Sequence, residues 1–282
     1  MKYSFDYEDY DQGLGAGDLL KTILEDKEFQ GQTELVIGNW GSILDEGCQT
    51  LIDGIVENKD YFSKVEKLFI GDMTYEECEV SWIIQGNYSK LWEAMPQLKE
   101  LIIKGSNDLQ LGEICHESLE SLTIICGGLH KSVIQSVQEA KLPNLKKLIL
   151  YIGIDEYGFD GDINTIKELL SKSDFPSLLY LGIVDSEIQD EITNEVLKSK
   201  YISQISTLDL SMGSLTDKGG EMLLEKIPVL PNIKQLDLHY HFLSEDMEKQ
   251  LSALPIEVDI SERNEPWRYK DGQVIYNPML TE

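Results

Sequence analysis

The sequence predicts an α/β solenoid, in which parallel strands form one curved sheet on the concave face and helices cover the convex face. Three observations favour this fold class. A short leucine frame recurs along nearly the whole chain, the segments between its copies are long enough for a returning helix, and several segments open on helix-capping residues. Apolar residues make up 41% of the 282-residue chain, which is enough for a sizeable core.

The repeated frame is L-x-x-L-x-L, with leucine at its centre. It occurs at Val65–Leu68–Ile70, Leu98–Leu101–Ile103, Leu119–Leu122–Ile124, Leu145–Leu148–Leu150, Leu178–Leu181–Ile183, Ile205–Leu208–Leu210 and Ile233–Leu236–Leu238. Degenerate copies flank these, Leu35-x-Ile37 before them and Val258-x-Ile260 after them. The step between central residues varies from 21 residues (Leu101 to Leu122) to 33 residues (Leu35 to Leu68). We therefore predict a leucine-rich-repeat solenoid of about nine irregular repeats over residues 31–261.

The spacing inside the frame assigns its residues to a strand. Residues two apart on a strand point to the same face, so both apolar residues of a Leu-x-Leu pair point into the solenoid. One unit cannot bury this face alone, whereas units stacked as parallel strands bury it together. Strands that alternate with helices in this way predict a right-handed βα superhelix shaped like a horseshoe.

Three connecting segments predict helices for the convex face. Ser186 precedes the first, Asp217 opens the second, and Ser244 precedes the third, each followed by apolar residues at helical spacing. The shortest step, of 21 residues, leaves room only for a loop or one helical turn.

Both ends of the chain are predicted to cover the solenoid, because open ends would expose its core and its strand edges. Residues 1–30 combine an aromatic, acidic segment with an amphipathic helix, and we interpret them as an N-terminal cap. Residues 262–282 contain Trp267, Tyr269 and Tyr276, and we interpret them as a C-terminal cap or a tail folded along the body.

Two runs carry a resemblance to known proteins. The run from Leu208 to Gly219 (LDLSMGSLTDKG) resembles the ribonuclease-inhibitor class of leucine-rich repeats. The run from Gly71 to Trp82 (GDMTYEECEVSW) resembles, more specifically, a family of uncharacterised bacterial cytoplasmic leucine-rich-repeat proteins. The same family fits Asp185–Glu191, Leu236–His239 and Trp267–Tyr269. The resemblance spans most of residues 30–270 and implies the fold and a cytoplasmic location, while the family has no assigned activity to carry over.

The charge of the chain restricts its partners. With 51 acidic against 24 basic residues, the formal net charge is −27. Such a surface repels phosphate backbones and anionic lipid, so we expect no nucleic acid and no membrane as partner. A basic protein or peptide is the favoured partner, although solubility alone is an alternative reason for the acidity. The acidic N-terminus, which lacks a signal sequence, and the four scattered cysteines favour the cytoplasm.

The residue between the two strand leucines faces the concave surface, about 4.8 Å from its lateral neighbours. In order along the solenoid this column reads Val36, Phe69, Ile102, Thr123, Ile149, Gly182, Asp209, Asp237 and Asp259. Its first half is apolar and its last third is acidic. With the columns on either side, the candidate partner-binding residues are Phe69, Ile102, Ile125, Ile149, Tyr151, Tyr180, Asp209, Asp237, His239 and Asp259.

Three stacked aspartates repel one another, so we expect a cation beside Asp209, Asp237 and Asp259. A partner's lysine or arginine, a metal, or the chain's own Arg263 or Arg268 would serve. The alternative is that water and self-pairing suffice and that the C-terminal tail covers the apolar strip.

Catalytic chemistry is the weaker interpretation of the same residues. Asp209, Asp237 and His239 form a weak candidate metal site, because carboxylates and an imidazole can hold a divalent cation. A Ser211–His239–Asp237 triad would lack an oxyanion hole on an open sheet. His241 occupies the repeat position whose side chain turns inward toward the backbone.

We therefore predict a non-enzymatic protein-interaction scaffold that needs no cofactor. A metal-dependent hydrolase, or an inhibitor or immunity-type protein against a basic toxin, are the alternatives. The sequence leaves the partner and the oligomeric state open.

Overall fold

A computed structural model describes residues 1–41, 43 and 46–281 of the chain. Within this part, ten strands form one parallel sheet in which each strand pairs only with its neighbours in sequence. The strands are β1 (Lys2–Tyr3), β2 (Glu34–Ile37), β3 (Lys67–Ile70), β4 (Glu100–Lys104), β5 (Ser121–Ile125), β6 (Lys147–Gly153), β7 (Tyr180–Ser186), β8 (Thr207–Asp209), β9 (Gln235–Asp237) and β10 (Glu257–Asp259). A separate antiparallel hairpin joins β11 (Trp267–Arg268) to β12 (Val274–Ile275).

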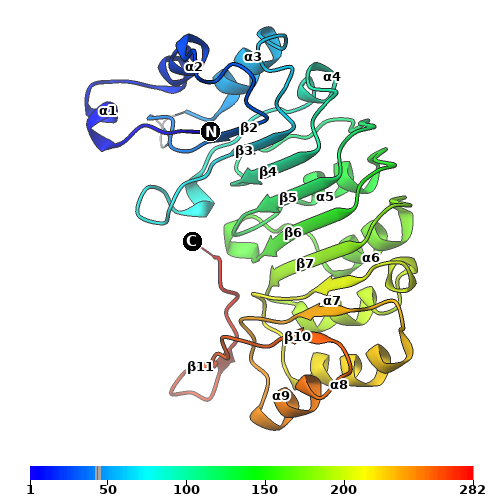
Figure 1. Ribbon diagram of the computed structural model, residues 1–282. Helices are drawn as coiled ribbons and strands as arrows, with labels where there is room; N and C mark the ends of the chain where they lie inside the picture. Colours follow the sequence, from blue (N-terminus) through cyan, green and yellow to red (C-terminus); the bar gives the residue numbers. More distant parts are fainter. Residues whose placement is uncertain (42, 44–45, 282) are drawn as a thin grey trace.

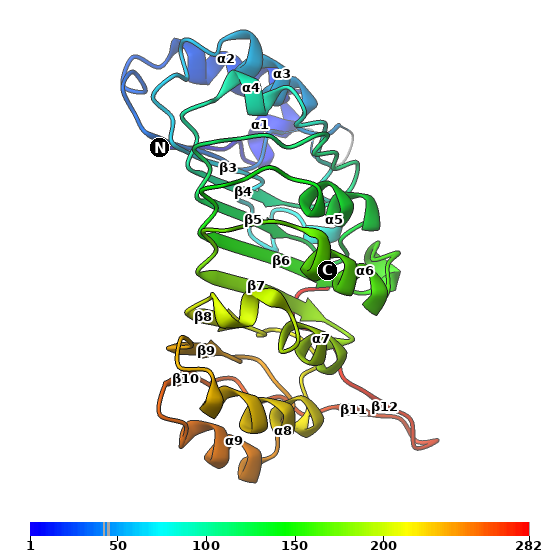
Figure 2. The ribbon, with the colours of Figure 1, turned by 90° about the vertical axis from the view of Figure 1, so that its right-hand side faces the viewer.

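The helices are α1 (Tyr7–Asp11), α2 (Ala16–Glu25), α3 (Gln49–Glu57), α4 (Leu91–Ala94), α5 (Lys131–Gln138), α6 (Ile163–Lys172), α7 (Gln189–Val196), α8 (Asp217–Lys226) and α9 (Glu245–Ser252). From α2 onward they lie along one side of the sheet and leave the other face free (Figures 1 and 2). The predicted α/β solenoid, with its parallel sheet and outer helices, is confirmed. None of the helices in the described ranges is both long and apolar enough to cross a bilayer.

The strand register is the one that the leucine frame predicts. Leu35, Leu68, Leu101 and their equivalents are lateral neighbours from β2 to β10, and the column from Val36 to Asp259 pairs at every step. The frame residues from Leu35 to Leu238 are almost fully buried, while Val258 and Ile260 of the last copy are partly buried. Stacking therefore does what a single repeat cannot, since each apolar face is closed by the repeats beside it.

One strand was not foreseen. Lys2 and Tyr3 form β1, which pairs in parallel with Val36 and Ile37 of β2, so the sheet has one strand more than the nine predicted repeats. The 21-residue step between β4 and β5 contains no helix in the described chain, which agrees with the prediction of a loop or one helical turn.

A residue in the left-handed region recurs at the same position of several repeats. Asp185, Met212, Tyr240 and Glu262 have φ angles of 56°, 65°, 55° and 62°, and each lies three residues after the concave column position of its repeat. Positive φ is uncommon for residues other than glycine, so its recurrence marks one turn geometry repeated along this edge.

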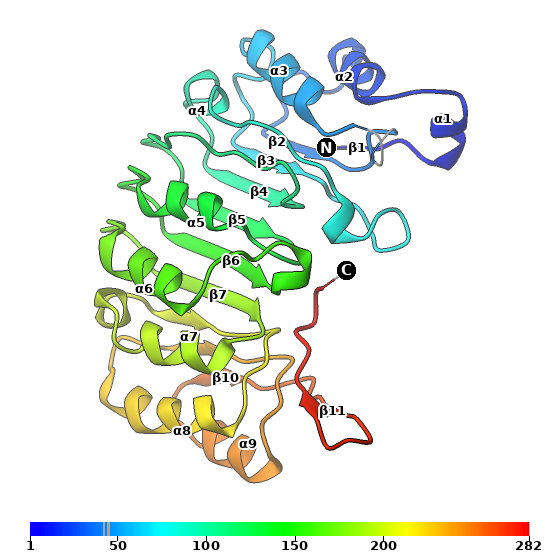
Figure 3. The ribbon, with the colours of Figure 1, turned by 180° about the vertical axis from the view of Figure 1, so that it is seen from behind.

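The segment after β12 runs back along these strand ends (Figures 1 and 3). The Met279 amide donates to the Met212 carbonyl oxygen at 2.8 Å, and the Leu280 amide donates to Asp185 Oδ1 at 2.8 Å. The tail therefore lies along the body of the solenoid, at the C-terminal edge of the strands.

Candidate functional site

The apolar half of the concave column lies on the helix-free face of the sheet. Val36, Phe69, Ile102 and Ile149 are partly exposed, and each is a lateral neighbour of the next member of its column. Ile125 and Tyr151 are partly exposed two residues further along their strands. Residues from separate repeats thus form an apolar strip, which Thr123 interrupts between Ile102 and Ile149.

A charged row borders this strip. Lys67 Nζ lies 3.2 Å from Glu34 Oε1 and 3.7 Å from Glu100 Oε2, which are its neighbours on β2 and β4. The hydrogen bond to Glu34 raises the pKa of Lys67 above its ordinary value. Further along the row, Lys147 Nζ lies 4.8 Å from the centre of the Tyr180 ring. The charged side chains of this row pair with one another beside the partly exposed apolar strip. A polar rim beside an apolar centre is also the usual arrangement of a protein interface.

In the middle of the column the residues are buried and present no side chain to solvent. Gly182 is buried between Ile149 and Asp209, and a Cβ there would lie 3.2 Å from Ile149 Cγ1 and 3.4 Å from Asp209 Oδ2. Val184, two residues later, is also buried. The apolar strip and the acidic end are therefore separate parts of the face.

Asp209 is held by its own repeat neighbours. It is only 5% exposed, the Tyr180 hydroxyl donates to its Oδ2 at 2.7 Å, and Ser211 Oγ donates to its Oδ1 at 2.6 Å. Burial raises the pKa of the Asp209 carboxyl, although these hydrogen bonds oppose the rise. Ser211 is thereby engaged with Asp209, and the structure does not bring its hydroxyl to His239 as a triad would need.

The other two aspartates have donors of the same kind. Asp237 Oδ1 lies 2.7 Å from His239 Nδ1 and accepts the His239 amide at 3.1 Å. Asp259 Oδ1 accepts from Ser261 Oγ at 2.7 Å, and this bond lowers the pKa of Asp259. Stacked carboxylates are thus accommodated by hydroxyl, amide and imidazole groups of the chain.

Arg263 does not neutralise these carboxylates. Its guanidinium pairs instead with Glu245 at 3.3 Å and Glu248 at 3.6 Å, both on α9. In the parts of the chain that are described, no ion pair joins a lysine or arginine to Asp209, Asp237 or Asp259.

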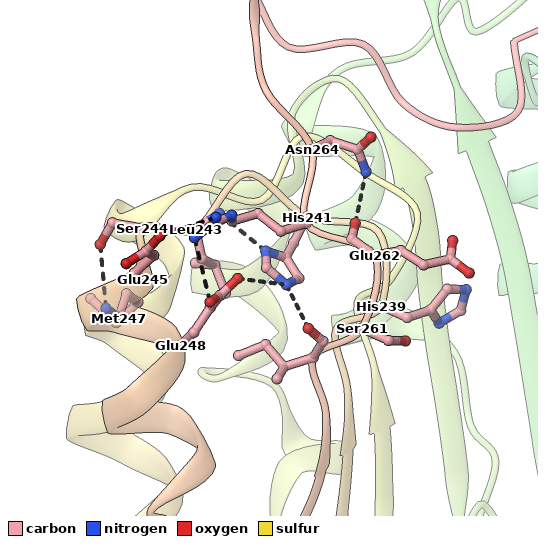
Figure 4. A network of polar contacts seen from close by, with 12 residues as sticks. His239, His241, Leu243, Ser244, Glu245, Met247, Glu248, Ser261, Glu262 and Asn264 are labelled. Atoms are coloured by element: carbon pink, nitrogen blue, oxygen red, sulfur yellow. Dashed lines mark hydrogen bonds and ion pairs between the residues drawn. The ribbon is translucent and has the colours of Figure 1, made fainter.

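The two histidines of this repeat have different surroundings (Figure 4). His241 is fully buried, its Nδ1 accepts the Leu243 amide at 3.1 Å, and its Nε2 lies 2.9 Å from the Ile260 carbonyl oxygen. It links its own turn to the next repeat, as expected of its position. His239 remains partly exposed on the concave side. Partial burial would lower the pKa of His239, but the hydrogen bond to Asp237 and the charges of Asp237, Asp209 and Asp259 raise it overall.

Two features lay outside the sequence reasoning. Asp185 is fully buried where the tail crosses β7, its Oδ2 has no hydrogen-bond partner, and burial raises its pKa well above the ordinary value. Exposed aromatic side chains also gather away from the concave column, among them Tyr7, Tyr75 and Trp82. The leucine frame carries no signal for either, because neither Asp185 nor these aromatic residues occupy a leucine position of the repeat.

Comparisons with known proteins give one informative match. No protein-family model and no curated protein matches the sequence. The chain is similar to the crystal structure of a protein from Bacteroides fragilis, at 40% identity over 100% of this chain and 77% of that chain, with a TM-score of 0.91. It is also similar to an internalin from Listeria monocytogenes, at 13% identity over 81% of this chain and 72% of that chain, with a TM-score of 0.33. The second similarity is too weak to carry an argument.

Proposed function

The chain belongs to the protein family of this Bacteroides fragilis relative, and from that premise we propose that it is a leucine-rich-repeat scaffold that binds a protein or peptide on its concave face. It acts by holding its partner and not by catalysing a reaction. The binding residues are those of the concave column and its neighbours, from Phe69 at one end to Asp259 at the other.

The observation that carries this proposal is the unbroken register of β2 to β10. Because every concave residue has a lateral neighbour from the next repeat, Phe69, Ile102 and Ile149 act as parts of one surface. Apolar strips on an otherwise polar surface are the usual mark of an interface. A single repeat would present too little area to bind anything.

The partner is a protein segment with apolar side chains followed by basic ones. The apolar strip supports the first feature, and the acidic end at Asp237 and Asp259 supports the second. A net charge of −27 would also speed the approach of a cationic partner.

We further propose a cytoplasmic protein with residues 1–30 and 262–282 as caps of the solenoid at 31–261. The four cysteines are free thiols, and three of them are buried, which fits a reducing compartment. The pairing of β1 with β2 supports the N-terminal cap, and the contacts of the C-terminal segment with Met212 and Asp185 support the alternative of a tail folded along the body.

The test is affinity purification from an extract of the native host, followed by quantitative mass spectrometry. We compare the wild-type chain with the double variant Phe69→Glu, Ile102→Glu. Val229→Glu is the matched control, because this valine is 71% exposed and lies outside the concave column. Loss of two central apolar contacts should weaken retention of a specific partner at least about tenfold.

The control variant should retain the partner as well as the wild-type chain does. Circular dichroism must show the same helix content for all three proteins. Equal retention by the double variant and the control, or no partner enriched by the wild-type chain, would refute a concave-face scaffold.

A further inference from the structure

Three potential metal ligands meet at the C-terminal end of the concave face. Asp237 and Asp259 are lateral neighbours on β9 and β10, and His239 follows Asp237 by two residues. One ligand atom from each lies within 4.8 Å of the other two. The strand register, which is fixed by the buried leucines, holds these three residues together.

No lysine or arginine among the described residues is paired with the carboxylates of this cluster. Asp237 Oδ1 contacts His239 Nδ1 at 2.7 Å, a contact that is an ion pair only when the imidazole is protonated. Asp259 has hydrogen bonds from Ser261 and no ion pair within the same residues. Arg263, the nearest arginine in sequence, is engaged by Glu245 and Glu248. The site therefore has two carboxylates and one imidazole, and no lysine or arginine of the described residues is paired with either carboxylate.

The ligands are also oriented before any cation arrives. The amide of His239 and the hydroxyl of Ser261 fix one oxygen of Asp237 and of Asp259. Each carboxylate keeps its second oxygen without a hydrogen bond inside the described chain. His239 Nδ1 is engaged by Asp237 Oδ1, which restricts the direction of the imidazole, so an ion at this site would be bound by the other ring nitrogen, Nε2, and by the second oxygen of Asp237.

We propose that Asp237, His239 and Asp259 bind one divalent transition-metal ion of the Zn²⁺ class. Imidazole and carboxylate ligands bind zinc at about 2.0–2.2 Å, so the three side chains, whose ligand atoms lie within 4.8 Å of one another, must move closer together on binding, and Asp259 is the exposed one of the three. The imidazole selects against Ca²⁺ and Mg²⁺, which prefer oxygen ligands alone. Water completes the coordination, because the site is open.

This site differs from the sequence-based candidate. Asp209 belonged to the weak candidate site of the sequence analysis, but its oxygens accept hydrogen bonds from Tyr180 and Ser211 and it is buried. Asp259 takes its place. The inference does not depend on the proposed scaffold function, since metal binding is measured on the purified chain alone.

The experiment is isothermal titration of the chelator-treated, full-length protein with ZnCl₂. We expect one ion per chain and a rise in melting temperature on adding zinc. His239→Ala and Asp259→Asn should each weaken zinc binding at least about tenfold, since each removes one of three ligands. MgCl₂ and CaCl₂ at the same concentrations should bind at least about tenfold more weakly.

His130→Ala is the matched control. His130 Nδ1 lies 3.9 Å from Asp160 Oδ1, so this pair also joins a histidine to an aspartate, but at another place on the molecule. Zinc binding that survives in His130→Ala and fails in His239→Ala, with unchanged circular dichroism, supports the site. No zinc binding by the wild-type chain, equal binding by His239→Ala, or equal binding of Ca²⁺ would overturn it.

Discussion

Replacing Tyr180 by phenylalanine tests how the acidic end of the concave face is held together. The ring and its contact with Lys147 would remain, while the hydroxyl that donates to Asp209 Oδ2 at 2.7 Å would be lost. A buried carboxylate oxygen left without its donor costs about 1–3 kcal/mol. For a chain of this size we expect the melting temperature to fall by on the order of 5 °C.

A double-mutant cycle with Asp209→Asn isolates this interaction. In the Asp209→Asn background the charged acceptor is gone, so Tyr180→Phe should cost less, by about 0.5–3 kcal/mol. Tyr75→Phe is the control, because the Tyr75 side chain is 63% exposed, and it should leave the melting temperature unchanged. An equal loss in both backgrounds, measured by thermal circular dichroism, would show that Tyr180 acts by packing alone.

The contribution of Asp209 to stability should also depend on pH. Burial raises the pKa of Asp209 in the folded chain above its unfolded value, so the folded state binds more protons between those two values. Stability from this group is therefore lost as the pH rises through the folded pKa. Asp209→Asn should gain in stability relative to wild type as the pH increases. A constant difference across the neutral and mildly acidic range would contradict the raised pKa.

Two further predictions follow from backbone and thiol geometry. Gly153→Ala should lower the free energy of unfolding by about 1–3 kcal/mol, because φ at this residue is 70° and a Cβ would lie 1.8 Å from the Gly127 carbonyl oxygen. Denaturant titration measures the change, and a variant as stable as the wild-type chain would refute the prediction. Cys115 should react with a thiol reagent much faster than Cys48 and Cys126. The Cys115 side chain is exposed, whereas burial raises the pKa of the other two thiols to about 12. Equal reaction rates for these cysteines would contradict the prediction.

The sequence predicted the sheet because its information is local and periodic. Leu68 and Ile70 must both point inward, and that alone fixes Phe69 on the concave face and sets its partner at Ile102. No such period marks Lys2 and Tyr3, so β1 was not predicted.

The details of the candidate site were less predictable. Tyr180 reaches Asp209 from the adjacent strand, across the position where Gly182 has no side chain. This contact depends on rotamers and on a missing Cβ, which a column of residue types does not record. The buried Asp185 beneath the tail depends in the same way on where an irregular segment comes to rest. Three-dimensional coordinates are needed for both.

The strand order, in which each strand touches only the one before and the one after, has a mechanical consequence. A chain pulled from its two ends would lose its repeats in succession, because no strand among the described residues pairs with a repeat beyond its neighbours. Damage to one repeat would likewise weaken its two neighbours and spare the others. The stability of each repeat thus depends on the contacts with its two neighbours, and a local change is not passed directly to distant repeats.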